Sequence, residues 1–176
     1  MNFNDFLRYD KETGSLYWKR RPSSMFNKQW QCDSWNTKYA GKKIITLDGK
    51  GYLVLSIFGK RYAAHRVIWE MVYGKPPTII DHINGVRTDN RLCNLREVTC
   101  QQNRMNAARP RTNTSGVIGV YLNKKRGIWC AQIKHNGHTR YLGSSPIFEE
   151  AVALRKAEEK RLGFSPAHGR LKNAKS

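Results

Sequence analysis

The chain has 176 residues, enough for one medium-sized domain or for two small ones. It carries 32 Lys and Arg against 13 Asp and Glu, a formal net charge of +19, and such an excess repels itself and favours a polyanionic partner. No apolar run approaches the roughly 20 residues of a membrane span, and the first residues lack the pattern of a signal peptide. We therefore expect nucleic acid as the partner, no membrane, and a cytoplasmic location.

Residues 1–62 are rich in aromatic and basic residues and in turn signals. The segment KETGSLYWKRR predicts a turn that leads into a strand. The segment LDGKGYLVLSIFGKRYAAH predicts two strands, with turns at Asp48-Gly49 and Phe58-Gly59. We expect a small antiparallel sheet in this region, and a β-rich domain that binds DNA.

The period of the apolar residues then changes to that of a helix. Apolar side chains recur on one helical face and stop before Gly74 and a pair of prolines. The residues on this face are Ala64, Val67, Ile68, Met71 and Val72.

The stretch IIDHINGVRTDNRLCNLREVTCQQN follows this helix and combines short apolar runs with many polar side chains. It predicts a strand at 79–83, a long polar loop, a second strand at 95–98 and a helix capped by Thr99. Together with the preceding helix, these elements make up a central domain at residues 63–106.

This order of elements is able to bring Asp81 near Asn103 on the last helix. A carboxylate and an amide oxygen suit one Mg²⁺ or Mn²⁺ ion, a hard cation that keeps much of its hydration. Beside such an ion, His82 could take a proton from the attacking water in phosphodiester hydrolysis. Asp81, His82 and Asn103 therefore form the candidate site.

The same stretch, DHINGVRTDNRLCNLREVTCQQN, resembles the HNH endonucleases with the ββα-metal fold, in particular the phage-type homing endonucleases. The segment AAHRVIWEMVYG also looks like the helix that precedes the motif in that group. The resemblance implies that Asp81 and Asn103 bind the metal and that His82 is the general base. It also implies that Asn94 fixes the active-site loop and orients the His82 ring. The third position of the motif is Asn103 rather than His; Asn also occurs there in the family, so the resemblance implies a weaker ligand and does not argue against activity.

Other polar residues of the central domain have simpler interpretations. Asn84 and Asn90 are typical turn formers in a long loop. A structural role is favoured for His65, on the helix that precedes the motif. Asn106, one turn after the motif ends, is a second candidate ligand.

A basic linker at 107–116 separates the central domain from a C-terminal module at 117–163, and a disordered tail is predicted at 164–176. The pattern of the module predicts three short strands followed by an amphipathic helix. Trp129 and Ala131 alternate onto the face that should pack on this helix.

The opposite face of the predicted sheet is polar, aromatic and basic. The segment that begins GVIGVYLNKKRG resembles the AP2/ERF DNA-binding domain, which implies a sheet laid in the major groove of DNA with a helix on its back. A solvated, charged sheet face is the alternative, as it is for the arginines of the central domain. The implied DNA-facing residues are Tyr121, Asn123, Lys125, Gln132, Lys134 and Tyr141, with Arg87 and Arg104 as further candidates in the central domain.

The four cysteines, at positions 32, 93, 100 and 130, form no closely spaced pair. This spacing argues against both a zinc ribbon and a disulfide framework. We expect the cysteines to be reduced, and a zinc site assembled from distant cysteines stays open as an alternative.

These patterns predict an α+β protein: a ββα-metal HNH core, an N-terminal antiparallel sheet, and a C-terminal three-stranded sheet plus helix. The expected function is that of a metal-dependent, site-specific DNA endonuclease of the homing type, either a nickase or a double-strand cutter. Its partner would be double-stranded DNA. No protein partner is implied, and a monomer is expected because two unlike binding modules flank one site. The alternative is a DNA-binding regulator with an inactive nuclease centre.

Overall fold

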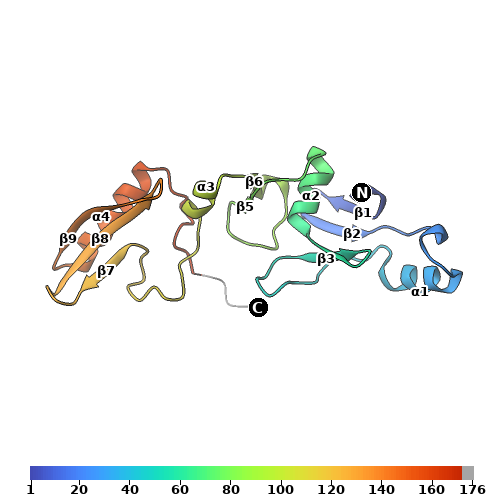
Figure 1. Cartoon of the computed structure of the whole chain (residues 1–176), viewed down its shortest axis with the longest axis horizontal. Coiled ribbons are helices and arrows are strands. Elements are labelled where there is room, and N and C mark those ends of the chain that lie inside the picture. Colours follow the sequence, from blue (N-terminus) through green and yellow to red (C-terminus); the bar gives the residue numbers. More distant parts are fainter. Residues whose placement is uncertain (172–176) are drawn as a thin grey trace. The chain divides into compact units, whose positions relative to one another are not determined.

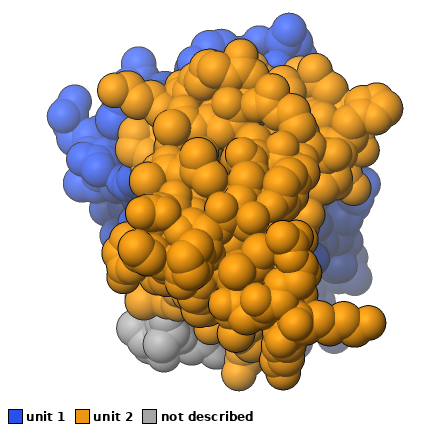
Figure 2. All heavy atoms as spheres, turned by 90° about the vertical axis from the view of Figure 1, so that its left-hand side faces the viewer, with its two compact units in different colours: residues 1–97 blue, residues 98–176 orange. Residues whose placement is uncertain are grey.

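The structure, a computed structural model, describes residues 1–171 of the chain (Figure 1). The chain folds into two compact units, residues 1–97 and residues 98–176 (Figure 2). Both units combine small antiparallel sheets or a three-stranded sheet with helices, so the α+β class predicted from the sequence is confirmed.

The first unit contains three two-stranded antiparallel sheets. Two are hairpins, formed by β1 (Leu7–Asp10) with β2 (Ser15–Trp18) and by β3 (Val54–Ile57) with β4 (Lys60–Ala63). The third pairs β5 (Ile80–His82) with β6 (Leu95–Glu97) across the polar loop. Its helices are α1 (Gln29–Tyr39) and α2 (Ala64–Tyr73), with short 3-10 turns at η1 (Phe3–Asp5), η2 (Ser23–Met25) and η3 (Leu92–Asn94).

The N-terminal region differs from the single small sheet expected there. Its strands form two separate hairpins, and helix α1 lies between them in the sequence. Only Cys32 and Asn36 of α1 are buried, so the helix has no apolar stripe that its sequence could have revealed. Asn36 fixes the helix instead, because its side chain accepts a bond from the Arg21 N–H and donates one to the Arg21 carbonyl, both at 2.9 Å.

Helix α2 forms the centre of the core of the first unit. The predicted face is confirmed for Ala64, Val67 and Ile68, which are almost fully buried. They pack with apolar side chains from η1, the two hairpins and β6. The helix ends as expected at Gly74, whose φ of +72° favours a residue without a side chain.

The second unit begins with the short helix α3 (Cys100–Met105) and continues with a three-stranded antiparallel sheet and a helix. The strands are β7 (Val120–Asn123), β8 (Ile128–His135) and β9 (His138–Ser145), in that order, followed by α4 (Phe148–Arg161). Trp129 and Ala131 contact Phe148 and Ala151 in the core of this unit, which confirms the predicted packing of the sheet on the helix.

The described part of the predicted disordered tail is folded. The N–H of Phe164 donates to the Glu159 carbonyl at 2.9 Å, and the rings of Phe164 and His168 lie 4.9 Å apart. His168 is buried against Arg155 and Glu159 of α4. The Phe164 ring and the contacts of His168 with Arg155 and Glu159 therefore hold this segment against α4. The rest of the predicted tail, 172–176, lies outside the described residues.

Two further findings concern the whole described chain. Across residues 1–171, no helix is both long and apolar enough to cross a membrane. The four cysteines are free thiols: Cys32 and Cys130 are buried, and Cys93 and Cys100 are exposed.

Candidate functional site

The two-stranded sheet of β5 and β6 places Asp81 and His82 in a buried position. Asp81 is paired with Arg96 in the strand register, and His82 with Leu95, which belongs to the core. Asp81 is 7% exposed and His82 is 4% exposed. A carboxylate and an imidazole at such depth need polar partners, because an unpaired buried polar group is costly.

His82 finds a partner in the polar loop. Its Nε2 lies 2.9 Å from the Oδ1 of Asn90, and Asn90 is only 1% exposed. The interpretation of Asn90 as a mere turn former is therefore wrong. The tautomer with the proton on Nε2 is the one that can donate to an amide oxygen, and Nδ1 is the basic nitrogen of that tautomer.

Asn94, expected both to fix the loop and to orient the ring, ties together two parts of the loop. Its Oδ1 accepts from the Asn84 N–H at 2.9 Å, and its Nδ2 donates to the Asp89 carbonyl at 2.8 Å. The side chain of Asn84 in turn donates to Asp89 at 2.9 Å. Asn90 also contacts the His82 ring, and the role of Asn94 in orienting that ring stays a prediction.

The first hairpin supports this part of the loop from a distant point in the sequence. The hydroxyl of Tyr9 on β1 donates to the Asn90 carbonyl at 3.0 Å. Gly14, in the β1–β2 turn, has a φ of +70°, and a Cβ there would lie 2.5 Å from the backbone nitrogen of Arg91. The turn can approach Asn90 and Arg91 so closely only because Gly14 has no side chain.

A second histidine contacts the first. The rings of His65 and His82 lie 5.2 Å apart in an edge-to-face arrangement, and Tyr52 stacks at 5.1 Å from His65 and 5.9 Å from His82. Arg87, a candidate DNA contact, lies over Tyr52 with its Cζ 4.8 Å from the ring centroid. His65, for which a structural role was favoured, therefore packs directly against the candidate base.

Burial keeps both imidazoles neutral near pH 7. It lowers the pKa of His65 to about 4, with further lowering from the nearby His82. Burial also lowers the pKa of His82, while its bond to Asn90 and the charge of Asp81 oppose that shift. A neutral imidazole is the form that can accept a proton, so the environment favours a base.

Asp81 forms an ion pair that the sequence analysis did not identify. Its Oδ2 accepts bonds from Nη2 of Arg96 at 2.9 Å and from Nε at 3.2 Å. The strand register explains this pairing, because residues opposite each other on paired strands project from the same face. An alignment of the two predicted strands could have identified it.

Asn103, the other predicted ligand, lies in the second unit. Helix α3 begins at the expected cap, where Thr99 Oγ1 accepts from the Gln102 N–H at 3.2 Å and Gln102 Oε1 accepts from the Thr99 N–H at 2.9 Å. Asn103 is exposed on this helix and Asn106 is buried at its end. Asn106 accepts through its carbonyl from Nη1 of Arg170 at 2.6 Å.

The residue types of the candidate site suit a hard cation. No group of three or more His, Cys, Asp or Glu that could hold a metal occurs within residues 1–171. Asp81 in the first unit and Asn103 in the second each offer an oxygen atom of the kind that Mg²⁺ and Mn²⁺ prefer. Within the described residues, no group of cysteines offers the several thiolates that a zinc site would need.

Five of the predicted DNA-facing residues of the C-terminal module lie on its strands, and Lys125 lies in the turn between β7 and β8. The register pairs Gln132 with Tyr141, and Tyr121 with Cys130, two residues before Gln132 on β8. Tyr121 is 42% and Tyr141 is 56% exposed, as a binding surface requires. The remaining members of the set are exposed or half-buried: Asn123, Lys125 and Lys134 on this module, and Arg104 on α3.

Comparison with known proteins supports the interpretation of the central stretch. Residues 62–105 match the family model of the HNH endonucleases. The chain is also 32% identical over 94 residues to Protein 3.8 of Escherichia phage T7, an alignment that covers 52% of this chain and 78% of that protein. No solved structure matches the chain. The likeness of the C-terminal module to AP2/ERF domains stays a prediction. The chain therefore belongs to the same family as Protein 3.8 of phage T7 and carries an HNH endonuclease domain at residues 62–105.

Proposed function

We propose that this protein is a metal-dependent, site-specific DNA endonuclease of the homing type, which hydrolyses phosphodiester bonds. One observation carries the proposal: within the matched HNH segment, the consecutive strand residues Asp81 and His82 are both buried, and Asn90 lies 2.9 Å from the His82 ring. A surface acid and histidine would need no such support.

His82 acts as the general base in this proposal. With Nε2 donating to Asn90, the ring would use Nδ1 to accept a proton from the water that attacks phosphorus. Burial lowers the pKa of His82, so the ring is neutral and able to accept at pH 7. Asn94 keeps the loop closed, and the first hairpin keeps Asn90 in place.

Asp81 and Asn103 would hold one Mg²⁺ or Mn²⁺ ion. Such an ion supplies a positive charge that stabilises the developing charge on phosphate and on the leaving oxygen. Arg96 orients the Asp81 carboxylate through two bonds from its guanidinium. Its charge also lies where a scissile phosphate beside Asp81 would approach.

DNA recognition falls to the flanks. The exposed face with Tyr121, Gln132, Lys134 and Tyr141 would enter the major groove, and the net charge of +19 would bind the phosphate backbone. We further propose a monomer that acts on double-stranded DNA in the cytoplasm. The domain boundaries predicted from the sequence stay part of this proposal.

The test compares the wild-type protein with His82→Ala on supercoiled DNA, with Mg²⁺, with Mn²⁺ and with a chelator. The wild type should convert supercoiled DNA to nicked or linear forms only with metal, whereas His82→Ala should bind DNA equally well and fail to cleave. Arg91→Ala, on an exposed side chain paired with Asp89 in the same loop, is the matched control. Equal cleavage by His82→Ala would remove His82 as base, and binding without any cleavage would favour the inactive regulator.

A further inference from the structure

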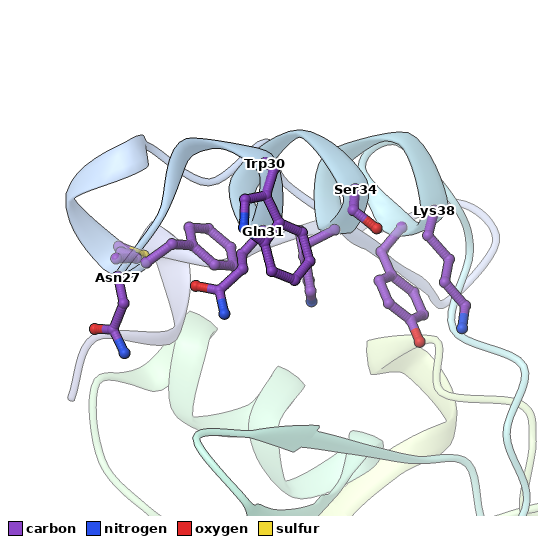
Figure 3. A pocket seen from close by; sticks show the side chains of 9 residues that line it. Asn27, Trp30, Gln31, Ser34 and Lys38 are labelled. Carbon is purple, nitrogen blue, oxygen red and sulfur yellow. The ribbon is translucent and has the colours of Figure 1, made fainter.

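Helix α1 and the segment before it carry a groove that the candidate site does not use (Figure 3). Its volume is about 470 Å³, within the range of small-ligand sites, and it opens broadly to solvent. The lining contains four aromatic rings, two amides and a lysine, and no acidic residue: Met25, Phe26, Asn27, Trp30, Gln31, Ser34, Trp35, Lys38 and Tyr39. Figure 3 shows the labelled Trp30, Gln31 and Lys38 projecting from the same side of the helix.

Three of the four aromatic rings of the groove contact one another, and the fourth, Trp30, is exposed. The rings of Trp35 and Tyr39 lie 5.2 Å apart, and Phe26 lies 6.4 Å from Trp35. Trp30 stands one helical turn before Ser34 and is 64% exposed, although tryptophan is on average a well-buried residue. Core packing therefore does not explain Trp30.

Trp35, which also lines the groove, is held by several contacts. Trp35 packs edge-to-face on Trp18 at 5.6 Å, and the Cζ of Arg21 lies 3.9 Å from the Trp35 ring centroid. The opposite side of α1 is fixed by the buried Cys32 and Asn36. A ligand that enters the groove would therefore meet a preformed surface, and little ordering would oppose binding.

The charge around the groove identifies the class of ligand. Residues 19–43 contain seven Lys and Arg and a single acid, Asp33, a net charge of +6. Aromatic faces next to lysines are the combination that binds single-stranded nucleic acid, because every base has a face to stack and every linkage has a charge to neutralise. Bases inside a duplex cannot present their faces to a tryptophan, so the ligand must be unpaired.

We infer that the groove at residues 25–39 binds unpaired nucleobases of single-stranded DNA, with a base stacked on Trp30. Lys38 neutralises a neighbouring phosphate, and the amides of Asn27 and Gln31 meet the polar edge of the base. This inference rests on the proposed function for the source of the strand, which is the DNA opened or frayed beside the cleaved site. The binding itself requires no cleavage.

The test measures binding of the full-length protein in chelator to a ten-nucleotide oligothymidylate and to an abasic strand of the same length and charge. Wild type should prefer the oligothymidylate. Trp30→Ala should weaken that binding by about 5- to 100-fold, the effect of losing one stacked base, and should leave the abasic strand unaffected. Trp30→Phe should keep most of the affinity. Ile45→Ala, at an apolar side chain that is 74% exposed outside the groove, is the control and should change neither.

Other outcomes would overturn the inference. Equal binding of the two strands by the wild type, or an equal loss for both strands in Trp30→Ala, would mean that no base stacks on Trp30. Self-association that Trp30→Ala abolishes would make the groove a contact between copies of the chain. Plasmid cleavage is measured separately. A base preference without cleavage would support the groove and contradict the proposed nuclease. Cleavage without a base preference would contradict the groove and leave the nuclease proposal intact.

Discussion

The side chains of Asn90 and His82 form a buried pair, with Asn90 Oδ1 2.9 Å from His82 Nε2. Asn90 is itself held through its carbonyl by Tyr9, from a strand 81 positions earlier in the sequence. The proposed base therefore depends on the N-terminal hairpin as well as on its own loop. This dependence gives the hairpin a role in the proposed active site, in addition to any contact with DNA.

Replacing Asn90 should lower turnover and leave DNA affinity unchanged. Asn90→Ala removes the partner that fixes the ring, and the loss of such an orienting bond typically costs about 10- to 100-fold in activity. Asn90→Asp keeps the shape but places a negative charge near the ring, which raises the pKa of His82. The acidic limb of its rate profile should therefore move to higher pH than that of the wild type.

The measurement is single-turnover cleavage as a function of pH for the wild type, Asn90→Ala, Asn90→Asp and the control Asn84→Ala. Asn84 belongs to the same loop, and its side chain bonds Asp89. Unchanged rates in Asn90→Ala, or a pH profile of Asn90→Asp identical to that of the wild type, would show that Asn90 does not position the base.

Burial of His65 should make the protein less stable in mild acid. The pKa of His65 is about 4 in the folded chain and about 6.5 in the unfolded chain. The unfolded state therefore binds more protons than the folded state as the pH falls below about 6.5. The free energy of unfolding should therefore be highest above pH 6.5 and fall as the pH drops toward 4. The loss due to His65 should be about 2 kcal/mol between pH 7 and pH 5.

Urea denaturation of the wild type and of His65→Gln at both pH values isolates this contribution. Glutamine does not titrate, so the difference in stability between the two proteins should change by that amount from pH 7 to pH 5. Groups that do not contact His65, His168 among them, titrate in both proteins and cancel in the comparison. A constant difference would place His65 in contact with water.

Arg96 should weaken the binding of a divalent ion at Asp81. Its guanidinium lies 2.9 Å from the Asp81 carboxylate, and a positive charge so close to a cation site opposes a second one. In Arg96→Gln the carboxylate loses this partner and should gain more from a metal. Mn²⁺ should therefore raise the thermal midpoint of Arg96→Gln more than that of the wild type, with half-saturation at a several-fold lower concentration.

The control for this experiment is Arg91→Gln, which removes the ion pair with Asp89 in the same domain. Its response to Mn²⁺ should match that of the wild type. Equal midpoint shifts in all three proteins would mean that the ion does not bind at Asp81.

The elements that could be predicted from the sequence are those fixed by local patterns. Helix α2 follows from its apolar period and Gly74, and α3 from the cap chemistry of Thr99. Helix α1 escaped prediction because its buried face consists of Cys32 and Asn36, a pattern with no apolar period. The HNH segment itself, at 62–105, was identifiable from its motif.

The parts that the sequence did not predict depend on contacts between distant residues. The partner of His82 could not be chosen among several asparagines, because the path of the loop depends on Tyr9 and on the close approach of Gly14 to Arg91. No local pattern encodes either contact. The same holds for the segment after α4, which polar composition alone suggested to be disordered.

That C-terminal segment should hold the helix that carries Asn103. The Ser165 N–H donates to the Met105 carbonyl at 3.1 Å, and the Gly169 N–H donates to the Ala107 carbonyl at 2.9 Å. Arg170 Nη1 donates to the Asn106 carbonyl at 2.6 Å, which satisfies a buried group at the end of α3. A helix of six residues is not stable alone, so α3 depends on these bonds.

Arg170→Ala should therefore loosen α3 and weaken the metal site, in addition to any effect on DNA. A charged hydrogen bond contributes about 1.5 kcal/mol or more, so exchange of the amide protons of residues 103–106 should accelerate about ten-fold. Cleavage should need more Mg²⁺, because Asn103 would be held less firmly. Arg161→Ala is the matched control, since Arg161 pairs with Glu158 on the exposed side of α4. Faster exchange with an unchanged Mg²⁺ requirement would mean that Asn103 on α3 does not bind the metal. Asp81 would then be the remaining proposed ligand.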